Sequence, residues 1–168
     1  YPVKNNLSIF LKKKHKVFKK LKWVHLTRAG VDECEPFMKS YKFKFTAGKR
    51  IQGPNVSEHC LSLLLAITRG LFDQYNEKKY TFRPTEIKNK KILIAGLGGI
   101  GDEIAKKLSQ FSSFISSVDH SNISKKYIIR NYFLKKIDRI INNYDILINA
   151  LPLTNKTKKI FNKKIFKK

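Results

Sequence analysis

The alternation of apolar and polar residues divides this chain into short apolar runs and longer helical repeats. The most continuous run, residues 92–94, is Ile-Leu-Ile and predicts a parallel strand covered on both faces. A more polar second strand is predicted over residues 114–118, and a third is predicted to end near Pro152. Two helical stripes lie between these strands. They consist of Ile100, Ile104, Leu108 and Phe111, and of Leu134, Ile137, Ile140 and Ile141.

The first part of the chain predicts a smaller pair of strands. Residues 22–26 and 43–46 have the short apolar and alternating patterns of strands. A basic segment, residues 1–22, carries apolar side chains at helical intervals and predicts a helix packed on a sheet. Glycines and a proline interrupt the pattern between residues 48 and 54, and we place a crossing between two domains there.

The longest apolar repeat covers residues 56–72 and predicts a helix. Asn55 followed by Glu58 has the capping-box pattern that starts a helix. The apolar arc is too wide for a surface helix, so we expect burial between domains or subunits. One stripe consists of Val56, Cys60, Leu63, Leu64, Ile67 and Leu71, and a second adds Leu61, Leu65 and Phe72.

A glycine cluster separates the first of the three strands from its helix. Gly96, Gly98 and Gly101 have the spacing Gly-x-Gly-x-x-Gly. In a dinucleotide site the first glycine makes a tight turn, the second lets the backbone approach a pyrophosphate, and the third allows close packing of helix on strand. The amides of Gly99 and Ile100 would then bind the phosphates at a helix start, where the dipole favours negative charge.

The same motif requires an acidic residue about 20 positions further on, which binds the adenosine ribose hydroxyls. Asp119 follows the second predicted strand at about that spacing. Strand, glycine turn, helix, strand and acid therefore occur in the order that predicts dinucleotide binding. A carboxylate repels a 2′-phosphate, so we expect NAD rather than NADP. The alternative interpretation is a cluster of turn glycines with an unrelated surface aspartate.

Several segments resemble, in order, the D-isomer-specific 2-hydroxyacid dehydrogenases. This resemblance implies an α/β fold: a Rossmann-type doubly wound parallel sheet, incomplete in this chain, preceded by part of a flavodoxin-like substrate domain. It implies a partial substrate domain over residues 1–54 and a partial NAD-binding domain over residues 55–168 that begins with the interdomain helix. The similar segments are residues 23–32, 53–71, 91–119 and 144–157.

The resemblance also implies further site residues. Ala29 and Gly30 would hold the substrate carboxylate through backbone amides. Leu151 and Pro152 would touch the adenosine half of the cofactor, and Thr157 would lie near it.

The catalytic residues of the family are an Arg, a Glu and a His, and they lie downstream of the last similar segment. The resemblance therefore implies that they would follow Lys168, the last residue of this sequence. We expect no catalytic residue in this chain, and we expect a fragment that is inactive by itself.

On this resemblance the chain is part of an NAD-dependent oxidoreductase acting on the CH–OH group of a small D-2-hydroxy acid. The reverse reaction would reduce a 2-oxo acid such as glyoxylate or hydroxypyruvate. We expect a cytoplasmic protein that is a homodimer when full length. Two alternatives from other classes remain open: a noncatalytic NAD-binding scaffold or sensor, and a basic nucleic-acid-binding protein.

Composition bears mainly on the choice between these classes. The formal net charge of +24 would attract nucleic acid or an anionic membrane. Most of the basic residues are lysines, however, whereas base and phosphate recognition favours the planar arginine fork, so we expect no specific nucleic-acid binding. The chain has no apolar run long enough to span a membrane and no signal-peptide pattern at its start. Cys34 and Cys60 are too few for a disulfide scaffold or a zinc site, which favours a reducing compartment and no metal.

Overall fold

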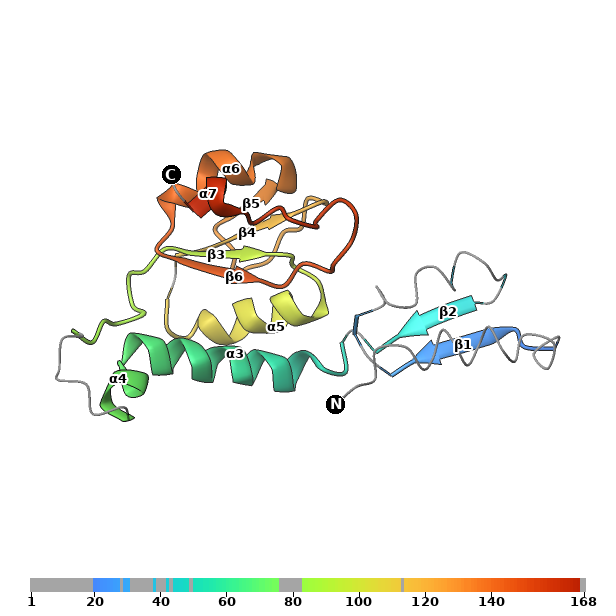
Figure 1. Ribbon diagram of the computed structural model, residues 1–168, viewed down its shortest axis with the longest axis horizontal. Coiled ribbons are helices and arrows are strands. Elements are labelled where there is room, and N and C mark those ends of the chain that lie inside the picture. The colour runs from blue at the N-terminus through green and yellow to red at the C-terminus, as the bar shows by residue number, and fades with distance from the viewer. Residues whose placement is uncertain are drawn as a thin grey trace.

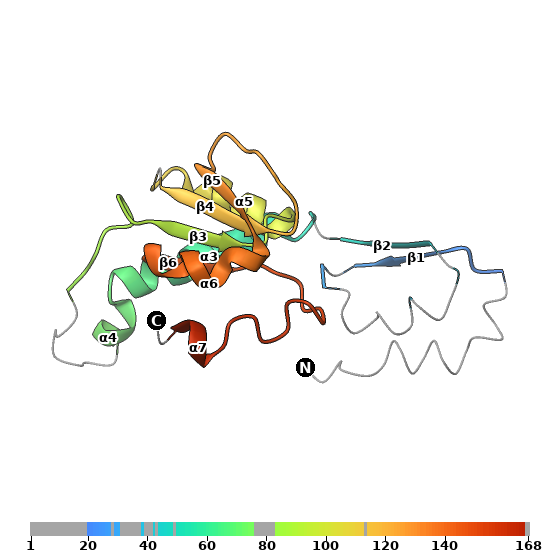
Figure 2. The same ribbon diagram turned by 90° about the horizontal axis from the view of Figure 1, so that it is seen from above.

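The strands of the protein form two separate parallel sheets. The computed structural model describes residues 20–27, 29–30, 38, 42, 44–48, 50–75, 83–112 and 114–166. Within these residues, a smaller sheet pairs β1 (Trp23–Leu26) with β2 (Lys44–Ala47). The larger sheet consists of β3 (Ile92–Ala95), β4 (Ile115–Asp119), β5 (Arg130–Phe133) and β6 (Ile146–Asn149). Its strand order is β5-β4-β3-β6. Figures 1 and 2 show β1 and β2 beyond the amino end of the long helix α3 (Gly53–Thr68).

The central strand of the larger sheet is β3, and its burial explains the continuous apolar run in the sequence. Ile92 pairs with Ile115 of β4 on one side and with Ile146 of β6 on the other. All four residues of β3 are buried, because helices cover both faces of the sheet. The predicted strands over residues 92–94 and 114–118 are confirmed, and the third predicted strand is β6.

Helices lie on both faces of the larger sheet. Figure 1 shows α5 (Gly99–Leu108) on one face with α3 (Gly53–Thr68) packed beneath it. The other face carries α6 (Ile137–Ile140), flanked by 3₁₀ turns at residues 134–136 and 141–143, and α7 (Lys163–Phe166). Side chains of β3 alternate between the two layers: Ile92 and Ile94 pack toward α5, and Leu93 and Ala95 pack toward α6. This arrangement confirms the doubly wound α/β fold.

A fourth strand, β5, was not predicted. Its sequence Arg-Asn-Tyr-Phe lacks the apolar run of β3, and its residues are exposed or only partly buried. Polar contacts replace apolar ones there: the Ser117 hydroxyl of β4 donates to Asn131 Oδ1 across 2.7 Å. An outer strand needs only one neighbour and can carry such polar residues, so hydrophobic periodicity did not reveal it.

The long helix starts earlier and ends earlier than predicted. α3 begins at Gly53 after Gln52, and no side chain caps its first turn, so the predicted capping box is wrong. Proline suits the first turn because its missing N–H would be unpaired there anyway, and Pro54 occupies that turn. The predicted capping partner, Glu58, instead forms a 2.9 Å ion pair with Lys107 of α5. A positive φ of 66° at Gly70 then separates α3 from the short helix α4 (Leu71–Tyr75).

Only part of the wide apolar arc of α3 is covered. The side that packs on the core beneath α5 contributes Cys60, Leu61, Leu64 and Leu65. Leu63 is 43% exposed and Ile67 58% exposed, so the first predicted stripe divides between a packed and an open side. Phe111 also departs from its predicted helical stripe, because α5 ends at Leu108 and leaves Phe111 exposed in the following turn.

The smaller sheet confirms the two strands predicted near the start of the chain. The Thr46 hydroxyl of β2 joins the two strands. Trp23 Nε1 of β1 donates to Thr46 Oγ1 across 2.9 Å, and His25 Nδ1 lies 2.8 Å from the same oxygen. Residues 20–22 are not helical, and the rest of the helix predicted over residues 1–22 lies outside the described residues. The domain boundary between residues 54 and 55 stays a prediction. None of the described helices is long and apolar enough to cross a bilayer.

Candidate functional site

The candidate site lies at the carboxyl edge of the larger sheet. Parallel strands place their carboxyl ends at one edge, which brings together Gly96 after β3, Asp119 at the end of β4 and Ala150 after β6. β3 and β6 are neighbours although β4 and β5 lie between them in the sequence. The chain adds β4 and β5 on one side of β3 and then returns to add β6 on the other side, so the strand order reverses between β3 and β6. Open α/β sheets bind ligands at such a point.

Gly96 closes this edge at the switch point. Its φ of +91° is a conformation that side chains rarely adopt. A Cβ on this residue would lie 2.9 Å from the carbonyl carbon and oxygen of Ala150, so the backbone after β3 directly touches the backbone after β6. Both the turn and the contact require glycine.

Gly98 and Gly101 face different surroundings. A Cβ on Gly101 would lie 1.9 Å from the carbonyl oxygen of Gly96, so only glycine lets α5 pack this closely on the turn. A Cβ on Gly98 would meet no atom within 4 Å, and Gly98 has a φ of −76° that any residue can adopt. Gly98 is therefore not required by the protein's own packing, and its open side leaves room for a ligand at the backbone.

Free backbone amides surround this open space. α5 begins at Gly99, and its first turn is closed by the Asp102 N–H, which donates to the Gly98 carbonyl across 2.9 Å. Among the described residues, the amides of Gly99 and Ile100 have no hydrogen-bond acceptor, as is usual for the first turn of a helix. Together with the positive end of the helix dipole, they form a site suited to a phosphate.

Asp119 is buried at the end of β4, with 5% of its surface exposed. Its Oδ2 accepts the Leu97 N–H across 2.7 Å, and its Oδ1 accepts the His120 N–H across 2.7 Å. Burial by itself raises the pKa of this carboxyl, but the N–H donors of Leu97, Ser121 and His120 outweigh it and hold the pKa below its ordinary value. Asp119 is therefore a carboxylate at neutral pH.

The loop after Asp119 is held by contacts that sequence reasoning missed. Asn131 of β5 donates through Nδ2 to the Ser121 carbonyl across 2.9 Å. Further along, Tyr127 Oη donates to the Asp102 carboxylate, and Lys125 Nζ lies 3.0 Å from the same group. The loop is thereby fastened to the first turn of α5, next to the glycine cluster. The sequence offered one signal for these contacts, Asp102 directly after the glycine motif, but an aspartate by itself does not identify its hydrogen-bond partners.

The other predicted contacts with the cofactor lie in the loop after β6. Leu151 is partly buried against the core cluster on the α6 side, whereas Pro152 is exposed. Thr157 closes a turn in this loop, because the Thr154 N–H donates to Thr157 Oγ1 across 2.8 Å. The loop leaves the sheet beside Gly96. The contacts that these side chains make within the protein do not assign them a role in ligand binding.

The predicted substrate contacts belong to the smaller sheet. Ala29 is partly buried and Gly30 is exposed, and both follow β1 at its carboxyl end. In Figure 1 the arrows of β1 and β2 point toward the larger sheet, and those of β3 and β6 point toward the smaller one. The carboxyl ends of the two sheets, with the loops that follow them, are therefore turned toward each other.

The predicted position of the catalytic residues is downstream of Lys168. Lys168 itself lies outside the described residues, which end at Phe166 after α7. The location of the catalytic Arg, Glu and His beyond Lys168 therefore stays a prediction.

Residues 61–168 match the model of the NAD-binding domain of D-isomer-specific 2-hydroxyacid dehydrogenases. The chain belongs to this family. A glyoxylate/hydroxypyruvate reductase A of Arabidopsis thaliana is 32% identical over 118 residues, which cover 66% of the chain and 37% of the plant protein. A D-3-phosphoglycerate dehydrogenase of Mycobacterium tuberculosis is 26% identical over 120 residues, which cover 68% of the chain and 23% of that enzyme. The chain therefore spans well under half the length of these relatives.

Solved structures of dehydrogenases from the family share the fold. A family member from Aeromonas salmonicida is 26% identical, with a TM-score of 0.72 over 88% of this chain and 49% of that one. A Xanthobacter autotrophicus dehydrogenase, solved in complex with NADPH and MES, has a TM-score of 0.79 at 17% identity over 99% of this chain and 52% of that one. The resemblance inferred from sequence motifs is confirmed, and with it an NAD-binding domain. The described residues contain no cluster of three metal-ligating side chains.

Proposed function

We propose that this dehydrogenase chain binds NAD at the carboxyl edge of its larger sheet and serves the reduction of a small 2-oxo acid, such as glyoxylate or hydroxypyruvate, to the D-2-hydroxy acid. The observation that carries this proposal is the open side of Gly98, bordered by free amides at the start of α5. The ionised carboxylate of Asp119, at the end of the neighbouring strand, supports it. The similarity to the plant glyoxylate/hydroxypyruvate reductase supports the choice of substrate.

Each group in the proposed site has one task. The amides of Gly99 and Ile100 hold the pyrophosphate, with Gly98 and Gly101 allowing the close approach of ligand and helix. Asp119 accepts a hydroxyl of the adenosine ribose through Oδ2, since among the described residues Oδ2 accepts only the Leu97 N–H, whereas Oδ1 is contacted by both His120 and Ser121. When bound, the cofactor supplies the hydride that the substrate carbonyl receives.

The remaining predicted contacts keep their proposed roles. Leu151 and Pro152 border the adenosine half of the cofactor and Thr157 shapes the loop that carries them. Ala29 and Gly30 hold the substrate carboxylate through their backbone amides, as the sequence resemblance implies. The direction of the strands supports this, because these loops lie at the facing ends of the two sheets.

Asp119 sets the preference for NAD over NADP in this proposal. Its charge opposes a 2′-phosphate on the ribose, and the 88% exposed His120 side chain lies against this carboxylate, with its Nδ1 2.7 Å from Asp119 Oδ1. Titration with NADH and with NADPH, followed by cofactor fluorescence, tests this. NADH should bind more tightly to the wild type, and Asp119→Asn should narrow the difference by about tenfold, the equivalent of about 1.4 kcal/mol. Tighter binding of NADPH by the wild type would refute the assignment.

The 168 residues supply cofactor binding rather than acid–base chemistry. Reduction of a ketone requires a proton donor near the carbonyl, usually a histidine. The described histidines, His25, His59 and His120, are all exposed, and none lies at a position that the resemblance makes catalytic. We therefore expect this chain by itself to oxidise NADH with glyoxylate, hydroxypyruvate or pyruvate no faster than a Gly98→Asp control. Faster turnover would contradict the expected inactivity of this chain, but it would not argue against the proposed cofactor-binding site.

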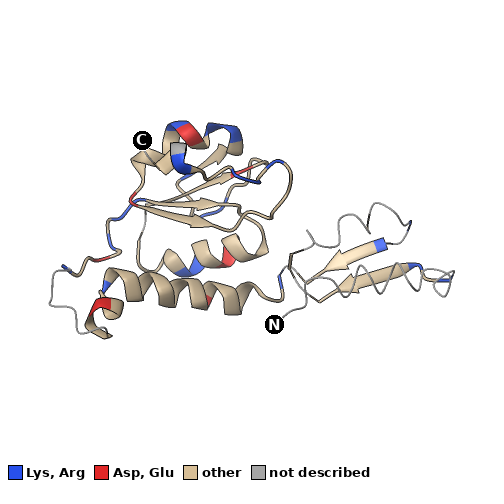
Figure 3. Cartoon of the chain, in the orientation of Figure 1, with Lys and Arg blue, Asp and Glu red and all other residues tan. Residues whose placement is uncertain are grey.

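We further propose that the full-length protein is a cytoplasmic homodimer that uses the exposed side of α3. A noncatalytic NAD sensor remains the second candidate, favoured by the complete set of phosphate-binding features in a chain without an assigned catalytic residue. Activity of a full-length form, which would include residues downstream of Lys168, separates the two. Nucleic-acid binding is not favoured, because Figure 3 shows the described Lys and Arg spread over several elements, including α6 and the segment before β3.

A further inference from the structure

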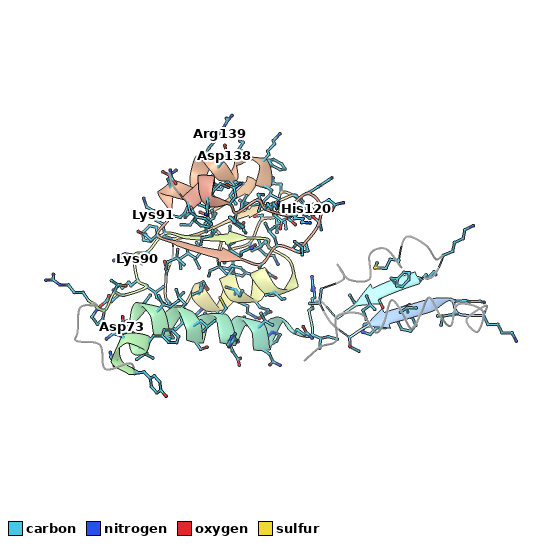
Figure 4. All side chains as sticks on the ribbon, viewed as in Figure 1. Asp73, Lys90, Lys91, His120, Asp138 and Arg139 are labelled. Carbon is cyan, nitrogen blue, oxygen red and sulfur yellow. The ribbon has the colours of Figure 1, made fainter. Side chains whose placement is uncertain are left out.

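The amino edge of the larger sheet carries a depression, lined by both polar and apolar side chains, that the proposed dinucleotide site does not use. It has a volume of about 250 Å³ and is lined by residues at the beginnings of β3, β4 and β5 and in the segment before β6. Figure 4 shows Lys91, one of its lining residues, at the opposite end of β3 from His120, which marks the carboxyl edge. The two sites are therefore separated by the length of the sheet.

The charge of this depression is positive. Arg130 and Lys91 line it, and no lining residue is acidic. Lys136 lies close enough to help lower the pKa of Tyr132 in the depression. The adjacent carboxylate, Asp145, accepts the backbone N–H of Lys91 across 2.8 Å through its Oδ2. The Arg and Lys head groups thus have no acidic partner within the lining.

A chain of hydroxyl groups orients the donors. Tyr144 and Tyr132 share a hydrogen bond, and Ser116 bonds to Tyr144 from the buried floor. Burial raises the pKa of Tyr144 to about 12, whereas the hydrogen bond from Tyr144 lowers the pKa of Tyr132.

Arg130 approaches the same phenol. Its Nη1 donates to Tyr132 Oη across 3.5 Å, and its guanidinium carbon lies 5.8 Å from the centre of the Tyr132 ring. Tyr132 Oη thus lies next to both Tyr144 and Arg130, and its hydroxyl belongs to a side chain that lines the depression.

We propose that this depression is a binding site for a small anion that carries a phosphate or carboxylate group. The Arg130 guanidinium offers the planar fork that suits such groups, and Lys91 adds a second positive charge. The Tyr132 hydroxyl and the Asn143 amide supply neutral donors. The anion is separate from the phosphates of the cofactor, which lie on backbone amides at the other edge, and the proposal does not depend on the proposed function.

The test is an NMR titration of the ¹⁵N-labelled chain, with inorganic phosphate in one arm and acetate in the other. The net charge of +24 makes diffuse anion binding a concern, so chloride holds the ionic strength constant in both arms. Saturable shifts of the Ser116, Arg130 and Tyr132 amides are expected in at least one arm, and comparison of the arms identifies the preferred group. Absence of saturation in both arms, or shifts confined to Gly99 and Ile100, would overturn the proposal.

A matched pair of variants separates this site from general electrostatics. Arg130→Gln should weaken binding about tenfold, whereas Arg139→Gln, which removes the same charge from α6, should change it less than about twofold. Tyr132→Phe keeps the ring and should weaken binding about threefold, which provides a test if Arg130→Gln fails to fold. Equal weakening by Arg130→Gln and Arg139→Gln, or no effect of Tyr132→Phe in a folded protein, would refute the site.

Discussion

The backbone N–H of Leu97 donates to Asp119 Oδ2 across 2.7 Å and joins the glycine turn to the end of the neighbouring strand. The carboxylate that sequence motifs assign to ribose binding thus also holds the turn that would carry the pyrophosphate. Asp119 is therefore expected to affect stability as well as cofactor binding, and the two effects can be measured separately.

Acid should weaken the contribution of Asp119 to stability. The pKa of this carboxyl in the folded state lies below the ordinary value of 3.8, so its contribution is present above that value and is lost as the pH falls through the lower folded-state pKa. Asp119→Asn should lower the free energy of unfolding at about pH 7 by roughly 1–3 kcal/mol, and by less at about pH 3. Urea unfolding at both pH values measures this.

A matched control for this experiment is Asp138→Asn, since Asp138 is exposed on α6 (Figure 4). It should change the free energy of unfolding by less than about 0.5 kcal/mol at either pH. If Asp119→Asn destabilised the protein equally at both pH values, the ionised state of Asp119 would not be the source of its contribution.

Two of the motif glycines, Gly98 and Gly101, should respond differently to substitution by alanine. Gly98→Ala should leave the free energy of unfolding unchanged but reduce NADH affinity by tenfold or more, because its methyl group points into space that the protein leaves open. Gly101→Ala should lower stability by about 2 kcal/mol or more, since its Cβ would lie 1.9 Å from the Gly96 carbonyl oxygen. Thermal unfolding and NADH fluorescence separate the two effects. A strongly destabilised Gly98→Ala protein would contradict the prediction.

The two sides of α3 should also differ. Leu64 packs against the core beneath α5, so Leu64→Asp should unfold the protein by burying an unpaired charge. Ile67 is 58% exposed, so Ile67→Asp should leave the fold intact and shift a dimer toward monomer. Light scattering combined with circular dichroism checks both variants. An Ile67→Asp protein with unchanged mass would argue against an interface on this side of α3.

Tyr127 should resist ionisation. Burial and the hydrogen bond to Asp102 raise the pKa of Tyr127 above its ordinary value, so its phenol should stay neutral at a pH at which a free tyrosine ionises. Tyr127→Phe removes the bond to Asp102 and should cost about 1 kcal/mol, because the pair is only partly buried. Ultraviolet titration of the phenols and urea unfolding measure these effects. A normal titration of Tyr127 would show that the loop is not held as described.

The local order of residues in the sequence identified the elements that have a regular apolar spacing or a backbone conformation that requires glycine. The strand at Ile92, the glycine turn and Asp119 were each predictable, because burial on both faces and glycine spacing leave a direct mark on the order of residues. The family resemblance rested on the same segments. The outer strand β5 left no such mark, since Asn131 bonds to Ser117 in place of apolar packing.

The sequence by itself determined the buried strand at Ile92, the glycine turn and the acid that follows it, because apolar periodicity and glycine spacing encode these features locally. The doubly wound fold was implied by the family resemblance of these segments. Only the tertiary structure decided which side of α3 is covered, because that depends on where α5 lies against it. It also decided that Asp119 reaches Leu97, and that Arg130, Tyr132 and Tyr144 meet at the amino edge. These contacts join residues from different strands, and their geometry follows from the register and direction of the sheet rather than from any local pattern.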